Sequence, residues 1–191
     1  DADRQLLPEG IVDAYPVGMV QLGMLYHMAF DDDKATPADY HNVTSFNMTL
    51  DAPYRLDIFQ QAVDKVIANQ PNYRTTFDLV NYSEPLQLIH ETLHVPVGYS
   101  DIRLKTDSEQ QAIVREFIEA ENYSGVDVTK LPLVRFHIHH LSDCTVCVTF
   151  TEPHSVADGW SLHLAFADIM NAYAAIEAGK AVTFAQLKTS Y

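Results

Sequence analysis

Apolar and polar residues alternate strictly in one part of this chain, where Phe46, Met48 and Leu50 share one parity and polar residues take the other. This alternation predicts a half-buried strand over Val43–Leu50. Shorter apolar runs predict further strands at Tyr73–Leu79, Leu86–Ile89, Val95–Tyr99, Leu133–Leu141 and Cys144–Thr151. The last two runs are separated only by residues 142–143, and this spacing predicts a hairpin.

Apolar residues that recur at spacings of three and four predict amphipathic helices elsewhere in the chain. The expected helices are Met19–Phe30, a segment that begins at Asp57 and is ended by Pro71, Ser108–Asn122 and Leu162–Ala178. Asp107 or Ser108 is the expected cap of the third helix, and Gly179 is the expected end of the last one. A sheet covered by helices on at least one face buries these apolar surfaces together. The expected fold class is therefore α/β or α+β, with a mixed β-sheet covered by helices.

The composition is typical of a globular domain, since 47% of the 191 residues are hydrophobic and 20% are charged. The net charge of −14 repels a phosphate backbone, so nucleic acid is not an expected partner. No apolar run reaches the length that a membrane span needs, and no membrane partner is expected. The first residues lack a signal-peptide pattern and the chain has only two cysteines, so the expected location is cytoplasmic.

The most informative polar residues lie in the loop after the last predicted strand, where Asp158 and Gly159 follow His154. A histidine at a strand end projects from the edge of the sheet, where clefts form, and its imidazole can transfer a proton. Asp158 can fix the geometry of the loop, and Gly159 lets a ligand approach the main chain closely. The alternative interpretation is an ordinary surface loop in which Asp158 caps the following helix.

Two other patterns resemble redox or metal sites. Cys144 and Cys147 are three residues apart on a predicted strand, so they point to opposite faces and cannot act as a pair. His137 and His139 share a strand face, but no cysteine or carboxylate lies at ligand spacing from them. No metal site is therefore expected.

Three stretches of the chain resemble, in the same order, motifs of the condensation domains of non-ribosomal peptide synthetases. Residues 13–27 (DAYPVGMVQLGMLYH) are similar to the opening motif, and residues 68–77 (ANQPNYRTTF) are similar to the second motif. Residues 127–135 resemble the stretch that precedes the active-site hairpin. The resemblance covers residues 8–180. It implies a lobe of the chloramphenicol-acetyltransferase-like fold.

The loop at His154 resembles the core motif of this family, HHxxxDG, and the resemblance implies roles for its residues. His154 matches the second histidine and is the expected catalytic residue. Pro153 stands where the family has its first histidine. Asp158 is expected to be a structural residue that forms an ion pair with Arg74. The residues expected to line the substrate tunnel are Gly159, Trp160 and Ser161.

The resemblance implies an enzyme that forms an amide bond. An acceptor amine attacks a donor thioester, and His154 either accepts the proton of the amine or orients it. Both substrates are carried on phosphopantetheine arms, so no directly bound cofactor is expected. The implied partners are donor and acceptor peptidyl carrier domains, an adjacent adenylation domain, and a C-terminal lobe that is missing from these residues.

The resemblance also implies how the chain is divided. Residues 1–15 are expected to be an extended lead-in, residues 16–180 an N-terminal lobe, and residues 181–191 the start of a connection to the second lobe. Because the substrate tunnel lies between two lobes, this chain alone is expected to fold and to be inactive. Two alternatives remain open: an epimerisation domain, which shares the HHxxxDG loop, and a non-catalytic relative that recruits a partner enzyme.

Overall fold

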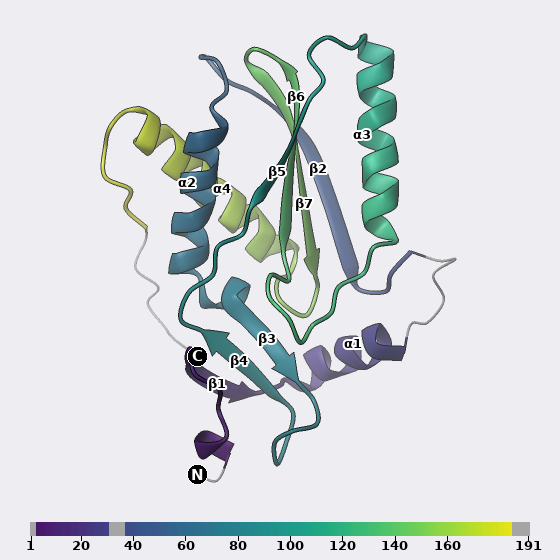
Figure 1. The fold of residues 1–191 in the computed structure, drawn as a ribbon, viewed down its shortest axis with the longest axis vertical. Helices are drawn as coiled ribbons and strands as arrows, with labels where there is room; N and C mark the ends of the chain where they lie inside the picture. The colour runs from purple at the N-terminus through teal and green to yellow at the C-terminus, as the bar shows by residue number, and fades with distance from the viewer. Residues whose placement is uncertain (1–2, 31–36, 185–191) are drawn as a thin grey trace.

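Seven strands form two separate sheets, and four α-helices pack around them, in the part of the chain that this computed structural model describes, residues 3–30 and 37–184 (Figure 1). The helices are α1 (Met19–Phe30), α2 (Leu56–Asn69), α3 (Asp107–Asn122) and α4 (Gly159–Glu177). The strands are β1 (Ile11–Pro16), β2 (His41–Thr49), β3 (Thr75–Asp78), β4 (Leu86–His90), β5 (Val97–Asp101), β6 (Arg135–Ser142) and β7 (Thr145–Pro153). Two short 3₁₀ turns, η1 (Asp3–Gln5) and η2 (Pro71–Arg74), complete the described elements.

The larger sheet is mixed, as the sequence predicts. Its strand order is β2-β7-β6-β5, in which β5 runs parallel to β6 and the other pairs are antiparallel. Helices α2 and α4 pack against each other on one face, and α3 lies along the other face (Figure 1). The predicted hairpin is confirmed as the β6–β7 pair.

The main hydrophobic core lies between the larger sheet and the layer formed by α2 and α4. On β7, every second residue faces this core, and Val146, Val148 and Phe150 are buried in it. Helix α2 buries Phe59 and Val63 completely, which confirms the spacing of three and four that predicted it. The core therefore rests on the two periodicities that are visible in the sequence.

A second, smaller sheet is a difference from the single sheet that the sequence predicts. It is antiparallel with the order β1-β4-β3, and α1 lies beside it in Figure 1. The segment that the sequence predicts as an extended lead-in contains β1, which is an edge strand of this smaller sheet. Tyr15 of β1 pairs with Gln87 of β4. A small core of Leu25, Phe77 and Leu133 lies in this part of the molecule. Of the expected connection over residues 181–191, residues 185–191 lie outside the described part of the chain.

The ends of the helices differ from the predicted ends in one informative place. Helix α3 is capped by Thr106, whose side chain accepts a hydrogen bond from the Glu109 N–H while the Glu109 carboxylate accepts one from the Thr106 N–H. This reciprocal arrangement is a capping box, so the prediction of Asp107 or Ser108 as the cap is wrong. Gly179 follows the end of α4 with a left-handed φ of 66°, as predicted.

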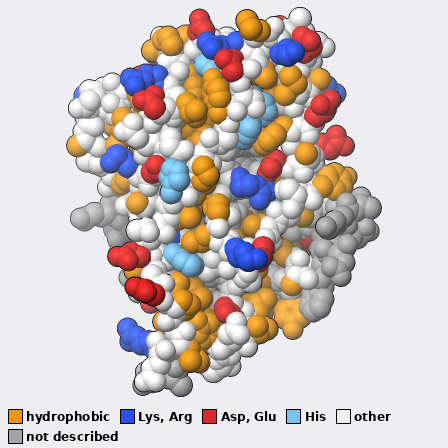
Figure 2. Space-filling view, viewed as in Figure 1, with side chains coloured by type: hydrophobic (Ala, Val, Ile, Leu, Met, Phe, Trp, Pro, Cys, Tyr) orange, Lys and Arg blue, Asp and Glu red, His pale blue; other side chains and the backbone are white. Residues whose placement is uncertain are grey.

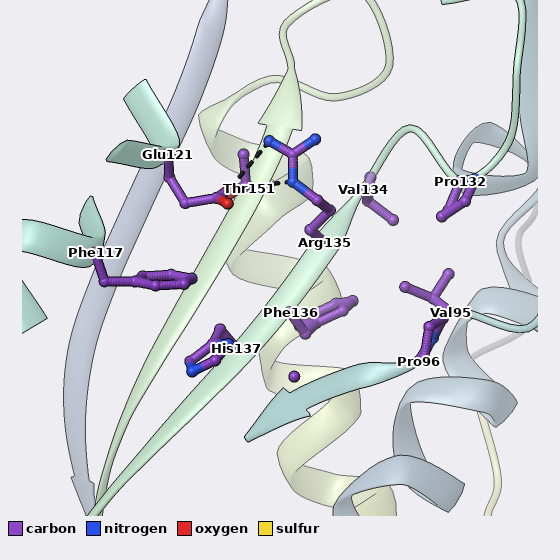
Figure 3. Close-up of a pocket in the computed structure, with 11 residues that line it drawn as sticks. Val95, Pro96, Phe117, Glu121, Pro132, Val134, Arg135, Phe136, His137 and Thr151 are labelled. Atoms are coloured by element: carbon purple, nitrogen blue, oxygen red, sulfur yellow. Dashed lines mark hydrogen bonds and ion pairs between the residues drawn. The ribbon is translucent and has the colours of Figure 1, made fainter. Parts of the chain in front are cut away.

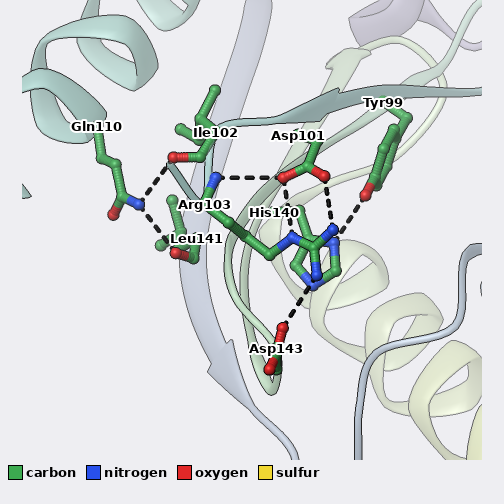
Figure 4. A network of polar contacts seen from close by, with 8 residues as sticks. All are labelled: Tyr99, Asp101, Ile102, Arg103, Gln110, His140, Leu141 and Asp143. Atoms are coloured by element: carbon green, nitrogen blue, oxygen red, sulfur yellow. Dashed lines mark hydrogen bonds and ion pairs between the residues drawn. The ribbon is translucent and has the colours of Figure 1, made fainter. Parts of the chain in front are cut away.

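A polar network ties the start of α3 to the β5–β6 end of the larger sheet (Figure 4). The Gln110 side-chain amide donates to the carbonyls of Ile102 and Leu141, at 3.0 and 2.8 Å. Arg103 contacts Asp143 in the hairpin turn at 2.9 Å. The two bonds of Gln110 fix the start of α3 on the sheet. The candidate site lies at the other end of β7, where the strand leads into the loop at His154.

Candidate active site

The loop that carries His154 joins the end of β7 to the start of α4, as the sequence predicts. The His154 N–H donates to the carbonyl of Tyr40 at 2.8 Å, and the Val156 N–H donates to the carbonyl of Pro153 at 2.9 Å. The His154 side chain is exposed, and among the described residues its imidazole has no hydrogen-bond or ion-pair partner. Within the described part of the chain, the ring is therefore accessible to a group from outside.

Asp158 is the N-cap of α4, and its carboxylate accepts a hydrogen bond from the Ser161 N–H at 2.8 Å. Its carbonyl accepts the first helical hydrogen bond, from the Leu162 N–H at 2.9 Å. The hydrogen bonds from Ser161 hold the pKa of Asp158 below its usual range. Asp158 therefore supports the loop by fixing where α4 begins.

The expected ion pair between Asp158 and Arg74 is not formed, and this prediction is wrong. Arg74 is only 8% exposed, and its guanidinium donates to the carbonyls of Ile67 at 3.2 Å and Glu91 at 3.0 Å, and also to that of His90. Carbonyls in the last turn of a helix attract a cation, and Ile67 lies in the last turn of α2. Arg74 is thus occupied by main-chain acceptors, while Asp158 is occupied by its own helix.

The three residues expected to line a tunnel lie at the exposed start of α4. Trp160 is 74% exposed, and Gly159 is exposed as well. A Cβ atom placed on Gly159 would have no neighbouring atom within 4 Å. The Ser161 carbonyl accepts a hydrogen bond of 3.5 Å from the Tyr73 hydroxyl. Nothing in this part of the chain crowds Gly159, so a steric need for glycine there has to come from a ligand or from another lobe.

Two side chains that the sequence analysis does not single out hold the main chain of this loop. The Gln21 side-chain amide, on α1, donates to the carbonyl of Ser155 at 2.9 Å. The Asn72 amide, in η2, donates to the carbonyl of Val156 at 3.4 Å. Both residues lie inside the stretches that resemble family motifs, which is the signal that could have identified them.

This chain is similar in sequence and in fold to known proteins. The family model that is described as "Condensation domain" matches residues 11–191. This chain belongs to the condensation domain family. Tyrocidine synthase 3 from Brevibacillus parabrevis is 24% identical to it over 174 residues, which cover 91% of this chain and 3% of that protein. The AMB antimetabolite synthetase AmbE from Pseudomonas aeruginosa is 32% identical over 182 residues, which cover 93% of this chain and 8% of that protein.

A solved condensation domain has the same fold. The starter condensation domain of rhizomide synthetase RzmA matches with a TM-score of 0.76 at 17% sequence identity. The match covers 90% of this chain and 41% of that one. The condensation-domain chain described here therefore spans less than half of the solved domain and a small part of the synthetases to which it is similar.

A buried acid lies just before the loop, at Glu152 on β7. It continues the buried face of β7 after Phe150, is 0% exposed, and its carboxylate oxygens make no hydrogen bond of ordinary geometry. Burial raises the pKa of Glu152 to about 8; the amide of Asn42, opposite it on β2, partly offsets this, and the charge of Asp158 adds to it. A buried carboxyl group whose pKa is raised therefore lies near the end of β7, close in sequence to His154.

The pocket in Figure 3 lies on the other face of the larger sheet, beneath α3. It has a volume of about 300 Å³ and apolar walls that include Phe117. Its polar groups bind one another, because the Glu121 carboxylate accepts hydrogen bonds from Arg135 at 2.9 and 3.0 Å and from Thr151 at 2.8 Å. With these groups paired and His154 elsewhere, the pocket is not part of the candidate active site.

Two histidines of β6 lie at or near this pocket. His137 and His139 have ring centroids 4.5 Å apart, and the ring of Phe117 contacts both. Burial, together with the charge of His137, lowers the pKa of His139 to about 4. No group of three His, Cys, Asp or Glu side chains in the described ranges is placed to hold a metal ion. Cys144 and Cys147 are both free thiols.

The surface in Figure 2 carries mixed charges. Lysines and arginines on this face are interspersed with aspartates and glutamates, and hydrophobic side chains lie between them. This distribution differs from the continuous basic stripe that binds a phosphate backbone. Among the described helices, none combines the length and the apolar character that crossing a membrane requires.

Proposed function

We propose that this chain is the His154-bearing N-terminal lobe of a peptide synthetase condensation domain, and that the complete domain catalyses amide-bond formation. The observation that carries the proposal is the exposed His154 on a main-chain loop held between β7 and the capped start of α4. The family membership, the similar peptide synthetases and the likeness to a solved condensation domain support the same assignment.

In the proposed reaction, the acceptor amine attacks the carbonyl carbon of the donor thioester. The new C–N bond forms, the C–S bond breaks, and the thiol of the donor arm leaves. The nitrogen loses one proton, which the exposed imidazole of His154 accepts or directs towards the leaving sulfur. Residues 154–156 hold the ring at the end of β7, and Asp158 fixes the helix that follows.

The partners in this proposal are donor and acceptor carrier domains with phosphopantetheine arms, a neighbouring adenylation domain, and a second lobe. The share of 41% of the solved domain is consistent with residues 16–180 being one of two lobes. A second lobe would supply the opposite wall of the site and exclude water from it. Holding both arms within reach of His154 is the larger part of such catalysis, so this chain alone should form no product.

The test is an assay of the full-length protein with a loaded donor carrier and a loaded acceptor carrier. His154→Ala should lower amide formation by about 100-fold or more, as expected for a lost proton-transfer group. His94→Ala is the matched control, since His94 is an exposed histidine that pairs with Asp64 on α2. An epimerised donor with no amide product would favour the epimerisation alternative, and no chemistry with any loaded pair would favour the non-catalytic one.

A further inference from the structure

We propose that Gln21 of α1 is a positioning residue for His154, a role that rests on the proposed function of the loop. The exposed imidazole has no side-chain partner among the described residues, so only the main chain on either side of His154 can fix its position. On one side, the His154 N–H is bound to the carbonyl of Tyr40. On the other side, the carbonyl of Ser155 is bound by Gln21.

The Gln21 amide is held in one orientation by both of its ends. Its oxygen accepts a hydrogen bond from the Gly18 N–H at 3.1 Å, and its nitrogen donates to the Ser155 carbonyl at 2.9 Å. Turning the amide over would bring two acceptors together at one end and two donors together at the other. A Cβ atom on Gly18 would lie 3.3 Å from the Gln21 oxygen, so a larger residue there would crowd the same group.

The two hydrogen bonds of the Gln21 side chain have different structural roles, one within α1 and one to the loop. This difference makes the proposal testable. The bond from Gly18 is part of the cap of α1, because Gln21 is the third residue of the helix and Gly18 directly precedes it. The bond to Ser155 reaches across 134 residues of sequence to the catalytic loop. Ser155 is only 2% exposed, so it is a firm anchor for the exposed residue beside it.

The substitution Gln21→Glu keeps the hydrogen bond within α1 and removes the one to Ser155. The carboxylate keeps an acceptor for the Gly18 N–H, and a negative charge in the first turn of a helix is favourable. It has no donor for Ser155 and places an oxygen against that carbonyl. In the full-length protein we expect kcat to fall about ten-fold or more while KM changes less than about two-fold, because a displaced catalytic group lowers the rate of the chemical step.

The matched control is Gln61→Glu. Gln61 is an exposed glutamine on α2 whose side chain donates to a carbonyl of its own helix at 3.1 Å, so the control makes the same chemical change away from the loop. It should leave kcat and KM unchanged. A Gln21→Glu protein with the kcat of the wild type overturns the proposal, provided that the wild type forms the amide.

Amide hydrogen exchange in the 191-residue chain tests the same contact without any substrate. Gln21→Glu should speed exchange of the His154 and Val156 amides by about five-fold, the factor expected for one lost neutral hydrogen bond, and should lower the melting temperature by no more than a few degrees. Unchanged exchange at both amides overturns the proposal. If the wild-type protein forms no amide, the proposed function fails, and the exchange measurement alone decides whether Gln21 holds the loop.

Discussion

Replacing Glu152 by glutamine removes a buried carboxyl group while preserving its size, and it should change how the stability of the chain depends on pH. Glu152 is 0% exposed, and its carboxylate oxygens make no hydrogen bond of ordinary geometry. Burial raises the pKa of Glu152 to about 8 in the folded chain, against an ordinary value of 4.5. The neutral glutamine side chain has no such equilibrium, so the pH dependence that comes from this group should disappear.

The direction of the pH dependence of unfolding follows from whether the folded or the unfolded chain holds the proton of Glu152 more tightly. Below about pH 4.5 the carboxyl is protonated in both states and has no effect on unfolding. Between pH 4.5 and about 8 it ionises only in the unfolded chain, which favours unfolding increasingly as the pH rises. Each pH unit contributes about 1.4 kcal/mol, so at pH 7 this group lowers the free energy of unfolding by about 3 kcal/mol relative to pH 4.5.

Urea unfolding of the wild type and of Glu152→Gln at pH 5 and pH 7 measures this difference. The variant should gain about 2–3 kcal/mol over the wild type between the two pH values. A buried glutamine amide also lacks partners, which adds a constant offset, so the change with pH is diagnostic and the absolute difference is not. Glu119→Gln, at an exposed position on α3, is the control and should show no such change. A gap between wild type and Glu152→Gln that is the same at both pH values would refute the reasoning.

Two further predictions concern the start of α4. Asp158→Ala removes an N-cap rather than half of a buried ion pair, so it should cost about 1 kcal/mol and lower the melting temperature by a few degrees, whereas Asp158→Ser should restore most of the loss. A cost of about 3 kcal/mol or more, the size expected for half of a buried ion pair, would contradict the capping role. Gly159→Ala should change the melting temperature of this chain very little, because a Cβ there has no neighbour within 4 Å. If its condensation activity falls in the full-length protein, the obstruction is to a substrate or to the second lobe; a large loss of stability would contradict this interpretation.

Patterns among neighbouring residues predict the positions of the helices and strands well. They do not predict which distant strands pair with one another. The alternation in β2 and the spacing in α2 are properties of neighbouring residues, so both elements lie close to their predicted positions. The capping box of α3 is also visible in the sequence, as Thr106 and Glu109 have the required spacing. The separate sheet of β1, β3 and β4 is not, because its pairing depends on contacts that periodicity does not encode.

The candidate site shows the same division. His154 and Asp158 are adjacent to one strand and one helix, so their positions follow from local structure. The predicted partner of Arg74 is wrong because main-chain carbonyls, which no sequence motif displays, compete for a buried guanidinium. Glu152 could have been noticed, since it interrupts the apolar series that includes Val148 and Phe150 on β7.

Arg74 has a mechanical consequence for the molecule. Its guanidinium joins a carbonyl of α2, which packs on the larger sheet, to carbonyls at the end of β4 in the smaller sheet. One side chain thus connects the two sheets, which have no strand in common. A lysine has three donors on one nitrogen in place of a planar fork, so it does not reproduce the fixed spread of donors with which the guanidinium reaches both sides. Losing these bonds would weaken one connection between the two sheets, and the main-chain supports of His154 come from Gln21 on α1, beside the smaller sheet, and from Tyr40, directly before β2 of the larger sheet.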